Sequence, residues 1–169
     1  MDVSLLLLDS MLGKFRAEKK WVLQALGQLS DEDIVWAPTP ESNSIANLIA
    51  HIRGTVHQRI ETIFKGVPDI RDRQSEFERG LYLSNEQATN LSGEAFDIVI
   101  QYLEHLKGQP ALLLTQPYLD KASLTHSAVN NQTTVLNLMI QMVREVHNHT
   151  GQIMYIAKMR KGQLQWKYD

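Results

Sequence analysis

Hydrophobic residues recur along most of the chain at steps of three and four, the period of an amphipathic α-helix with one buried face. Four long segments carry this pattern, and polar or proline-containing connections separate them. The segments span Ser4–Gln28, Ser44–Lys65, Ser84–Lys107 and Thr133–Lys161. Apolar and polar residues never alternate for more than a few positions, so no substantial sheet is expected. The pattern predicts an all-α protein, a four-helix bundle with long connecting loops.

Capping residues set the expected helix ends. Ser42 or Ser44 is expected to cap the second helix. A capping-box pattern at Ser84 favours a third helix that starts there, although Gly93 weakens its middle and leaves a start near Ser92 open. A short helical turn is expected after Leu29, where a serine precedes three acids. One core is expected to hold a residue from each long helix: Leu12, Ile52, Val99 and Met142.

Two connections are unusually long. The first, residues 67–83, contains a dense run of mixed charges from Asp69 to Arg79, and loops of this length are often functional. Phe77 is its one large aromatic side chain, so we expect Phe77 to be the strongly buried residue that pins the loop over the bundle. The second, residues 109–131, contains two prolines, and Ser123–Val129 alternates weakly, as a short extended segment does.

Composition narrows the function classes. A chain of 169 residues suits one domain, expected over residues 1–169, and a net charge of −2 disfavours nucleic-acid binding. The absence of cysteine excludes disulfides, thiolate metal ligands and a cysteine nucleophile, and it fits the cytoplasm, the expected location. The first apolar run follows Asp2 and is soon interrupted by charges, so we expect neither a signal peptide nor a membrane span.

Two ionisable side chains lie in the apolar face of the last helical segment. Glu145 and His149 are four residues apart, which makes them neighbours on one helix face, whereas His147 points to nearly the opposite side. A buried charge is unfavourable unless it is paired or binds a metal. Glu145 and His149 therefore form part of a metal site or a buried ion pair, or Glu145 pairs with Arg144 or with a lysine of another helix. Their spacing alone does not decide among these.

A metal site in a helical bundle draws its ligands from facing helices, so a third ligand is needed. His51 lies on the flank of the apolar stripe of the second helix, beside residues that fit the edge of a polar pocket. His57 has more polar neighbours and is expected to be more solvated. His105, close to the end of the third helix, is expected at the surface, and His126 lies in the second long loop. Helical position alone does not choose among these candidates.

Several motifs, spread in order over nearly the whole chain, resemble the DinB/YfiT-like superfamily. Ser42–Gly54 resembles its second-helix motif, and Arg71–Phe77 resembles the loop signature of one small branch of it. His149–Ile153 resembles the fourth-helix pattern His-x-Gly-Gln-Ile. Leu29–Asp33 and the Trp-x-Pro that begins at Trp36 fit as well. Each motif is modest, but the ordered set is fairly specific.

The resemblance implies a four-helix bundle that holds a divalent metal with three histidines, one on helix two and two, four apart, on helix four. His51 and His149 match two of these by position, while the third position is Glu145. Two histidines and a carboxylate suit zinc or nickel, the expected cofactors, and also iron or manganese. The carboxylate leaves two outcomes open: a site with altered metal preference or a site that has lost its metal.

Members of the superfamily with known activity include metal-dependent thiol S-transferases and a thiol-dependent isomerase, and others are described as metal-dependent hydrolases. The resemblance thus implies a metal-dependent transferase or hydrolase that acts on a small molecule, with a low-molecular-weight thiol as a candidate substrate and a homodimer as a common assembly. The alternative is a metal-free bundle that binds a small ligand or mediates dimerisation. In the metal-site reading, Asn47 and Gln152 are candidates to hydrogen-bond the free imidazole nitrogens, and residues 71–78 are expected to wall the pocket.

Overall fold

A computed structural model describes residues 2–115 and 133–167, and all regular secondary structure within them is helical, without a strand. The prediction of an all-α protein is therefore confirmed for the described part of the chain. Three short helices cap or connect the long ones: α2 (Asp31–Val35), η2 (Ser75–Phe77) and η3 (Pro110–Leu114). The long helical segments are α1 (Val3–Leu26), α3 (Ile45–Val56) with its continuation η1 (His57–Thr62) and α4 (Ile63–Lys65), α5 (Asn85–Lys107) and α6 (Val135–Lys161).

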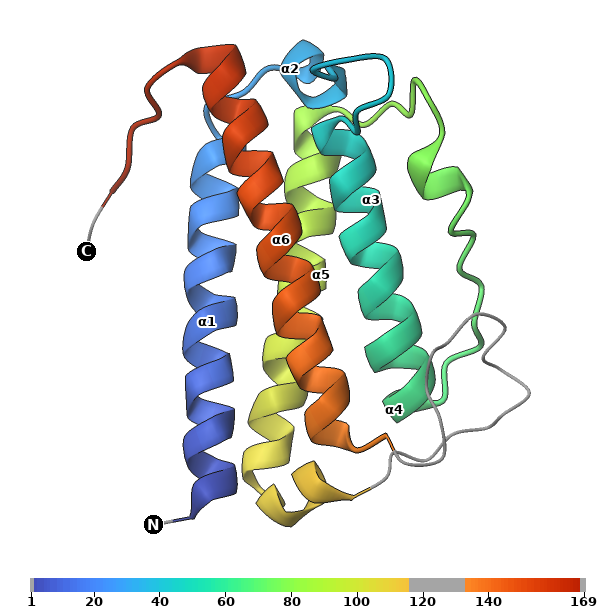
Figure 1. The fold of residues 1–169 in the computed structure, drawn as a ribbon, viewed down its shortest axis with the longest axis vertical. Helices are drawn as coiled ribbons and strands as arrows, with labels where there is room; N and C mark the ends of the chain where they lie inside the picture. Colours follow the sequence, from blue (N-terminus) through green and yellow to red (C-terminus); the bar gives the residue numbers. More distant parts are fainter. Residues whose placement is uncertain (1, 116–132, 168–169) are drawn as a thin grey trace.

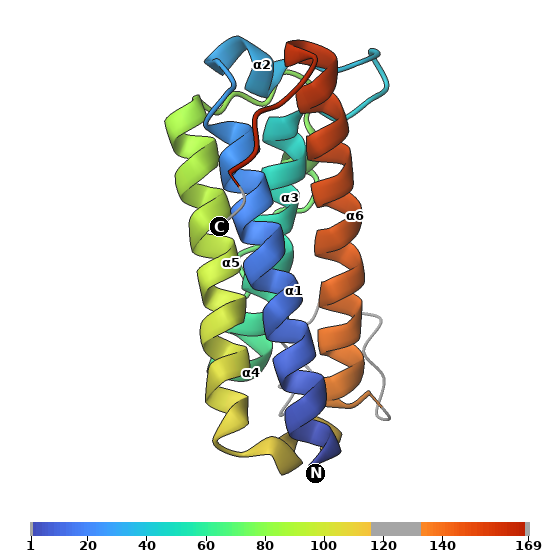
Figure 2. The same ribbon diagram turned by 90° about the vertical axis from the view of Figure 1, so that its left-hand side faces the viewer.

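The four long segments lie side by side along the long axis of the molecule (Figures 1 and 2). α1 packs against α5 and α6, and α3 packs against the same two helices. α3 and α5 run in the same direction, opposite to α1 and α6 (Figure 1). Residues 66–84 make this possible, because they return past the outer side of α3 to the end at which it began. The crossover thereby places a charged loop against α3.

One hydrophobic core joins all four segments. Leu12, Ile52, Val99 and Met142, the four residues expected to share a core, are all buried in it, so that prediction is confirmed. Burial of each such side chain stabilises the fold by about 1.5–3 kcal/mol. No helix among the described residues has the length and apolar character that crossing a membrane requires.

Side-chain caps define the helix ends much as their sequence signals predict. Ser30, Ser44 and Ser84 each form a capping box at the start of a helix. The box at Ser84 starts α5 at Asn85, so a start near Ser92 is wrong. A reciprocal cap contributes about 1 kcal/mol, which offsets the similar penalty of Gly93 in the helix interior.

The second long segment changes its hydrogen-bond pattern partway along. α3 is an ordinary α-helix to Val56, and His57–Thr62 then form a π-helical turn before α4. The segment ends at Gly66, whose positive φ of 68° suits a residue without a Cβ. π-helical turns are rare and occur frequently at functional sites. Apolar periodicity does not reveal this turn, which the sequence analysis did not predict.

The charged loop is anchored by a different residue from the expected one. Glu76 is only 6% exposed, whereas the neighbouring Phe77 is half-buried, so the prediction that Phe77 is the strongly buried residue is wrong. Glu76 tolerates burial because Arg71 and His51 bind its carboxylate. The weakly alternating Ser123–Val129, with His126, falls outside the described residues.

Candidate metal centre

Three side chains from the packed helices α3 and α6 converge on one point. His51 comes from α3, and Glu145 and His149 come from α6. The Nε2 atom of His51 lies 2.9 Å from Glu145 Oε1, and the Nε2 atom of His149 lies 3.4 Å from the same oxygen. The possible ligand atoms of the three residues all lie within 4.8 Å of one another. The structure thus brings together the three residues that the sequence analysis singled out.

The side chains of this group are largely shielded from solvent. Those of His51, His149 and Glu145 are 5%, 15% and 22% exposed. Burial by itself raises the pKa of Glu145, but the hydrogen bond from His51 and the positive charge of Arg59 outweigh it, so that the pKa lies below its usual value. Glu145 is therefore ionised at neutral pH and offers a charged oxygen ligand.

A row of polar residues along α3 and the π-helical turn includes His51. Asn47, His51, Thr55 and Gln58 follow one another at steps of three and four, so they share one helix face, and all four are buried. Thr55 Oγ1 and Gln58 Oε1 each accept a hydrogen bond from Arg71, at 3.1 and 2.9 Å. This polar face therefore binds the charged loop.

Glu76 and Arg71 form a buried ion pair behind His51. Arg71 donates from Nε and Nη2 to the two carboxylate oxygens of Glu76, at 2.6 and 2.8 Å. Both side chains are 7% exposed. Burial alone raises the pKa of Glu76, but the hydrogen bonds from Arg71 and His51 lower it below its usual value. Glu76 is thus a fixed anion, and it can only accept hydrogen bonds.

This fixed anion determines which nitrogen of His51 carries a proton. The Nδ1 atom of His51 lies 2.8 Å from Glu76 Oε2 and 3.2 Å from Arg71 Nη2. Because the carboxylate is the nearer group and can only accept, we assign the proton to Nδ1. In a neutral imidazole, Nε2 then presents a lone pair to the ionised Glu145, and two acceptors 2.9 Å apart repel each other. A cation between them removes the repulsion, and it is either a proton on Nε2 or a metal ion. A carboxylate behind a histidine is also the usual support of a metal ligand.

Of the two residues expected to hydrogen-bond the imidazoles, Gln152 lies beside a histidine ring and Asn47 does not. Gln152 lies next to His149, with its Oε1 3.3 Å from His149 Nδ1, which leaves Nε2 of that ring facing Glu145. Asn47 does not touch an imidazole. Its amide donates to the backbone oxygens of Glu76 and of residue 78, both at 3.0 Å, and so fixes the loop that carries Glu76.

The remaining described histidines do not reach the centre. His57 was expected to be more solvated but is buried, because Nδ1 lies 3.0 Å from Glu61 and Nε2 accepts from the backbone N–H of Ile70 at 3.3 Å. His105 is exposed, as predicted. His147 lies on the α1 side of α6 and pairs with Glu18 at 2.7 Å.

A polar cavity of about 340 Å³ opens beside the centre. His51 and Glu145 form one part of its wall, together with polar residues of α3 and of the π-helical turn. Arg71 and residues 72–74 of the charged loop form another part. Phe77 lies over the ring of His51, with the ring centroids 4.8 Å apart. The cavity gives a small molecule room to reach His51 and Glu145, two of the three converging side chains.

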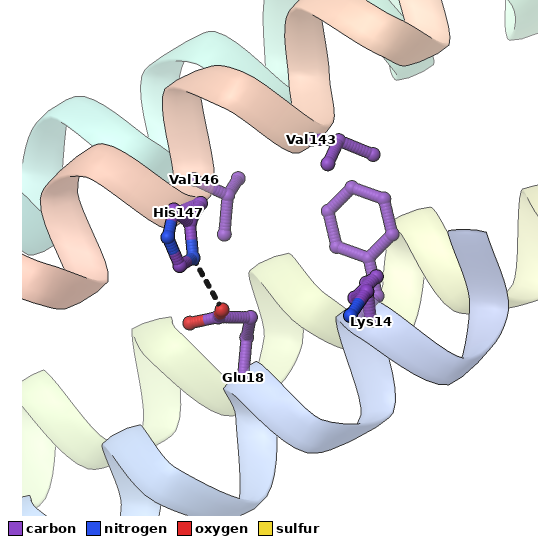
Figure 3. Close-up of a pocket in the computed structure, with 6 residues that line it drawn as sticks. Lys14, Glu18, Val143, Val146 and His147 are labelled. Carbon is purple, nitrogen blue, oxygen red and sulfur yellow. Dashed lines mark hydrogen bonds and ion pairs between the residues drawn. The ribbon is translucent and has the colours of Figure 1, made fainter. Parts of the chain in front are cut away.

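A second cleft, of about 270 Å³, lies between α1 and α6 (Figure 3). Phe15, Val143 and Val146 line it, and the His147–Glu18 pair crosses its edge. Its polar groups are on the rim and do not converge on a point. It therefore lacks the arrangement of ligands or reactive groups that the first cavity has.

Residues 71–74 line the cavity, in agreement with the expectation that residues 71–78 wall the pocket, whereas Thr55, Gln58 and Arg59 were not expected there. The polar row of α3 was detectable, because Asn47, Thr55 and Gln58 stand at helical spacing from His51 in an otherwise apolar segment. Glu76 carried no such signal, since one acid in a run of charges is usually solvated. Arg59 carried no such signal either, because an arginine is usually solvent-exposed.

Comparison with known proteins places the chain in a family. The family model described as "Protein of unknown function (DUF1572)" matches residues 2–168. A search of curated proteins found no match. Because the family model covers nearly the whole sequence, the chain belongs to the DUF1572 family.

Proposed function

We propose that the protein is a metal-dependent enzyme whose divalent ion, zinc or nickel, is held by His51, Glu145 and His149. The observation that carries this proposal is the convergence of these three side chains, with His51 backed by the fixed anion Glu76. Ligands about 2.1 Å from a tetrahedral ion lie about 3.4 Å apart. The separations of 2.9 and 3.4 Å from Glu145 Oε1 are close to that value. The donor set therefore fits the ion with small side-chain movements.

The proposed architecture is the DinB/YfiT-like four-helix bundle, formed by α1, α3 with its continuation, α5 and α6. The ordered sequence motifs support it, as does the packing of α1 and α3 against the same two helices. In this arrangement α3 and α6 each contribute to the metal site from their middle turns. The resemblance implies a thiol S-transferase or a hydrolase acting on a small molecule.

The bound ion would supply Lewis acidity and lower the pKa of a thiol or water in the cavity. The residues of the chain prepare the site. Glu76 holds the Nδ1 proton of His51 and orients its ring, so that Nε2 faces Glu145. Phe77 packs against that ring. Gln152 lies against Nδ1 of His149. None of these contacts requires the reactant, so the ligands are positioned before it binds.

The metal-free alternative has one specific observation in its favour. A doubly protonated His51 would donate to both Glu76 and Glu145, and all three charges would then be paired without a metal. In that case the polar cavity binds a small ligand, or the protein acts through dimerisation.

Metal content distinguishes the two functions. The wild-type chain and His149→Ala are purified without a polyhistidine tag, equilibrated with zinc or nickel and desalted, and the bound metal is measured by elemental analysis. We expect about one ion per wild-type chain and a large loss in His149→Ala, since His149 supplies one of only three protein ligands. His147→Ala is the matched control, because it removes the same side chain from the same helix on the side that faces α1.

Three results bear on the proposal. Loss of metal in His149→Ala but not in His147→Ala supports the site. Equal metal content in the wild type and His149→Ala rejects it. Absence of metal from the wild type favours the metal-free alternative.

A further inference from the structure

One arginine in the wall of the polar cavity lacks a partner that its burial requires. Arg59 lies on the π-helical turn, and its Nη1 atom is buried without a hydrogen-bond partner. No carboxylate within the described residues lies at ion-pair distance from it. A buried donor without an acceptor is unfavourable, and more so if it is charged. The guanidinium can therefore bind an acceptor that the described residues do not supply.

The other nearby arginines on these elements are already engaged. Arg53 lies between Glu61 and Glu94, at 2.8 Å from each, and Arg71 binds Glu76. Arg73 lies over the ring of Phe77, 5.1 Å from its centroid. Arg59 is thus distinguished by a buried guanidinium nitrogen that is left without an acceptor.

The charges of the cavity wall indicate what would occupy the space. Arg71 is neutralised by Glu76, which leaves Arg59 and Arg73 to face the acids Glu145 and Asp72. These four charges cancel. A divalent ion on His51, Glu145 and His149 gives the cavity an excess of positive charge, and an anion is the ligand that compensates it.

We propose that the cavity binds a small molecule bearing a carboxylate, which Arg59 holds through its guanidinium beside the metal centre. This inference rests on the proposed function and names its substrate class. Arginine suits the role because its planar guanidinium can bind both oxygens of a carboxylate. The cavity of about 340 Å³ has room for a small ligand next to the ion. Arg59 positions the substrate and takes no part in bond breaking.

Succinate is a suitable probe, and its uncharged isostere succinamide is the control ligand. Binding to the zinc-loaded full-length chain is measured by calorimetry at constant ionic strength. We expect succinate to bind the wild type and succinamide not to bind. Arg59→Gln should weaken succinate binding about tenfold or more, the usual effect of losing a charge-assisted hydrogen bond, while zinc content stays unchanged. Arg53→Gln is the matched control, because Arg53 belongs to the same helical segment but does not line the cavity.

The outcomes separate this inference from the proposed function. The anion site is refuted if the zinc-loaded wild type does not bind succinate. It is also refuted if Arg59→Gln binds succinate as tightly as the wild type. Neither result contradicts the metal site. Failure of the wild type to hold zinc is detected by elemental analysis before any ligand is added, and it counts against both proposals. Arg59→Lys gives a second variant if the glutamine variant does not fold. It retains the charge but loses the planar pair of donors, so we expect partial succinate binding.

Discussion

Gly54 offers the sharpest test of the loop that supports the candidate metal centre. It lies in α3, and a Cβ added there would come within 1.9 Å of Glu76 Oε1 and 3.0 Å of Arg71 Nε. Gly54→Ala would therefore push the buried Glu76–Arg71 pair away from α3. The substitution alters no candidate ligand and adds only one methyl group.

Two opposing effects determine the expected magnitude. Alanine is favoured over glycine in a helix interior by about 1 kcal/mol. Against this, overpacking a filled site destabilises by about 1–3 kcal/mol, and each hydrogen bond to a charged group contributes about 1.5–3 kcal/mol. Glu76 accepts from Arg71 and His51, so its displacement puts several such bonds at risk. We expect a net loss of about 1–3 kcal/mol in the free energy of unfolding.

The chain provides a matched control at another helical glycine. Gly93 lies within α5, and a Cβ added there meets nothing within 4 Å. Gly93→Ala should therefore stabilise the protein by about 1 kcal/mol through helix propensity alone. Urea unfolding in a metal-free buffer, fitted with a common m-value, measures both variants. The same chemical change should thus shift the unfolding midpoint in opposite directions at the two positions.

A double-mutant cycle with Glu76→Ala identifies the cause. If the carboxylate is the obstacle, Gly54→Ala should become neutral or stabilising once Glu76 is shortened. If Gly54→Ala stabilised the protein as much as Gly93→Ala does, the packing of Glu76 against α3 would be refuted. An undiminished destabilisation in the Glu76→Ala background would show that the loop carboxylate is not its source.

Two further predictions concern stability. Asp33 accepts hydrogen bonds from Arg160 and Lys161, at 2.8 and 2.7 Å; burial alone raises the pKa of Asp33, but these bonds hold it well below its usual value. Asp33→Asn should lower the free energy of unfolding by about 2–3 kcal/mol at pH 7. Measured from urea midpoints, this difference should shrink below about pH 4, because protonation of Asp33 removes the wild-type advantage. A difference that does not depend on pH would contradict this prediction. Phe77→Ala should destabilise the protein by about 1–2 kcal/mol in the same assay. This is less than the 3–5 kcal/mol typical of a fully buried aromatic, because Phe77 is half-buried. An unchanged free energy of unfolding would mean that the contact of Phe77 with His51 is not stabilising.

The helices were predictable because their signals are local. Steps of three and four mark each buried face, and capping residues such as Ser44 and Ser84 mark the starts. The π-helical turn at His57–Thr62 was not predictable in this way, because its residues keep a helical pattern whichever hydrogen bond the backbone makes. Only the packed structure determines which pattern is present.

The candidate site was predictable only where helical spacing related its members. Glu145 and His149 are one turn apart, so their proximity follows from the helix itself. That His51 lies opposite them depends on how α3 and α6 pack, which spacing does not determine; the resemblance to a known family supplied that expectation. The burial of Glu76 depends on its pairing with Arg71 in the same loop and on the docking of that loop against α3, a tertiary contact without a periodic signal.

Glu145 and Arg59 are best understood together. The sequence resemblance implies a neutral histidine where this chain has Glu145, and a carboxylate there adds a negative charge to a sheltered site. Arg59 is the nearby cation whose charge helps to keep Glu145 ionised, although the two do not form an ion pair. Coordination of a divalent ion by Glu145 would neutralise that carboxylate and leave Arg59 without its compensating charge. Metal binding and anion binding should then strengthen each other, since each relieves an imbalance that the other creates.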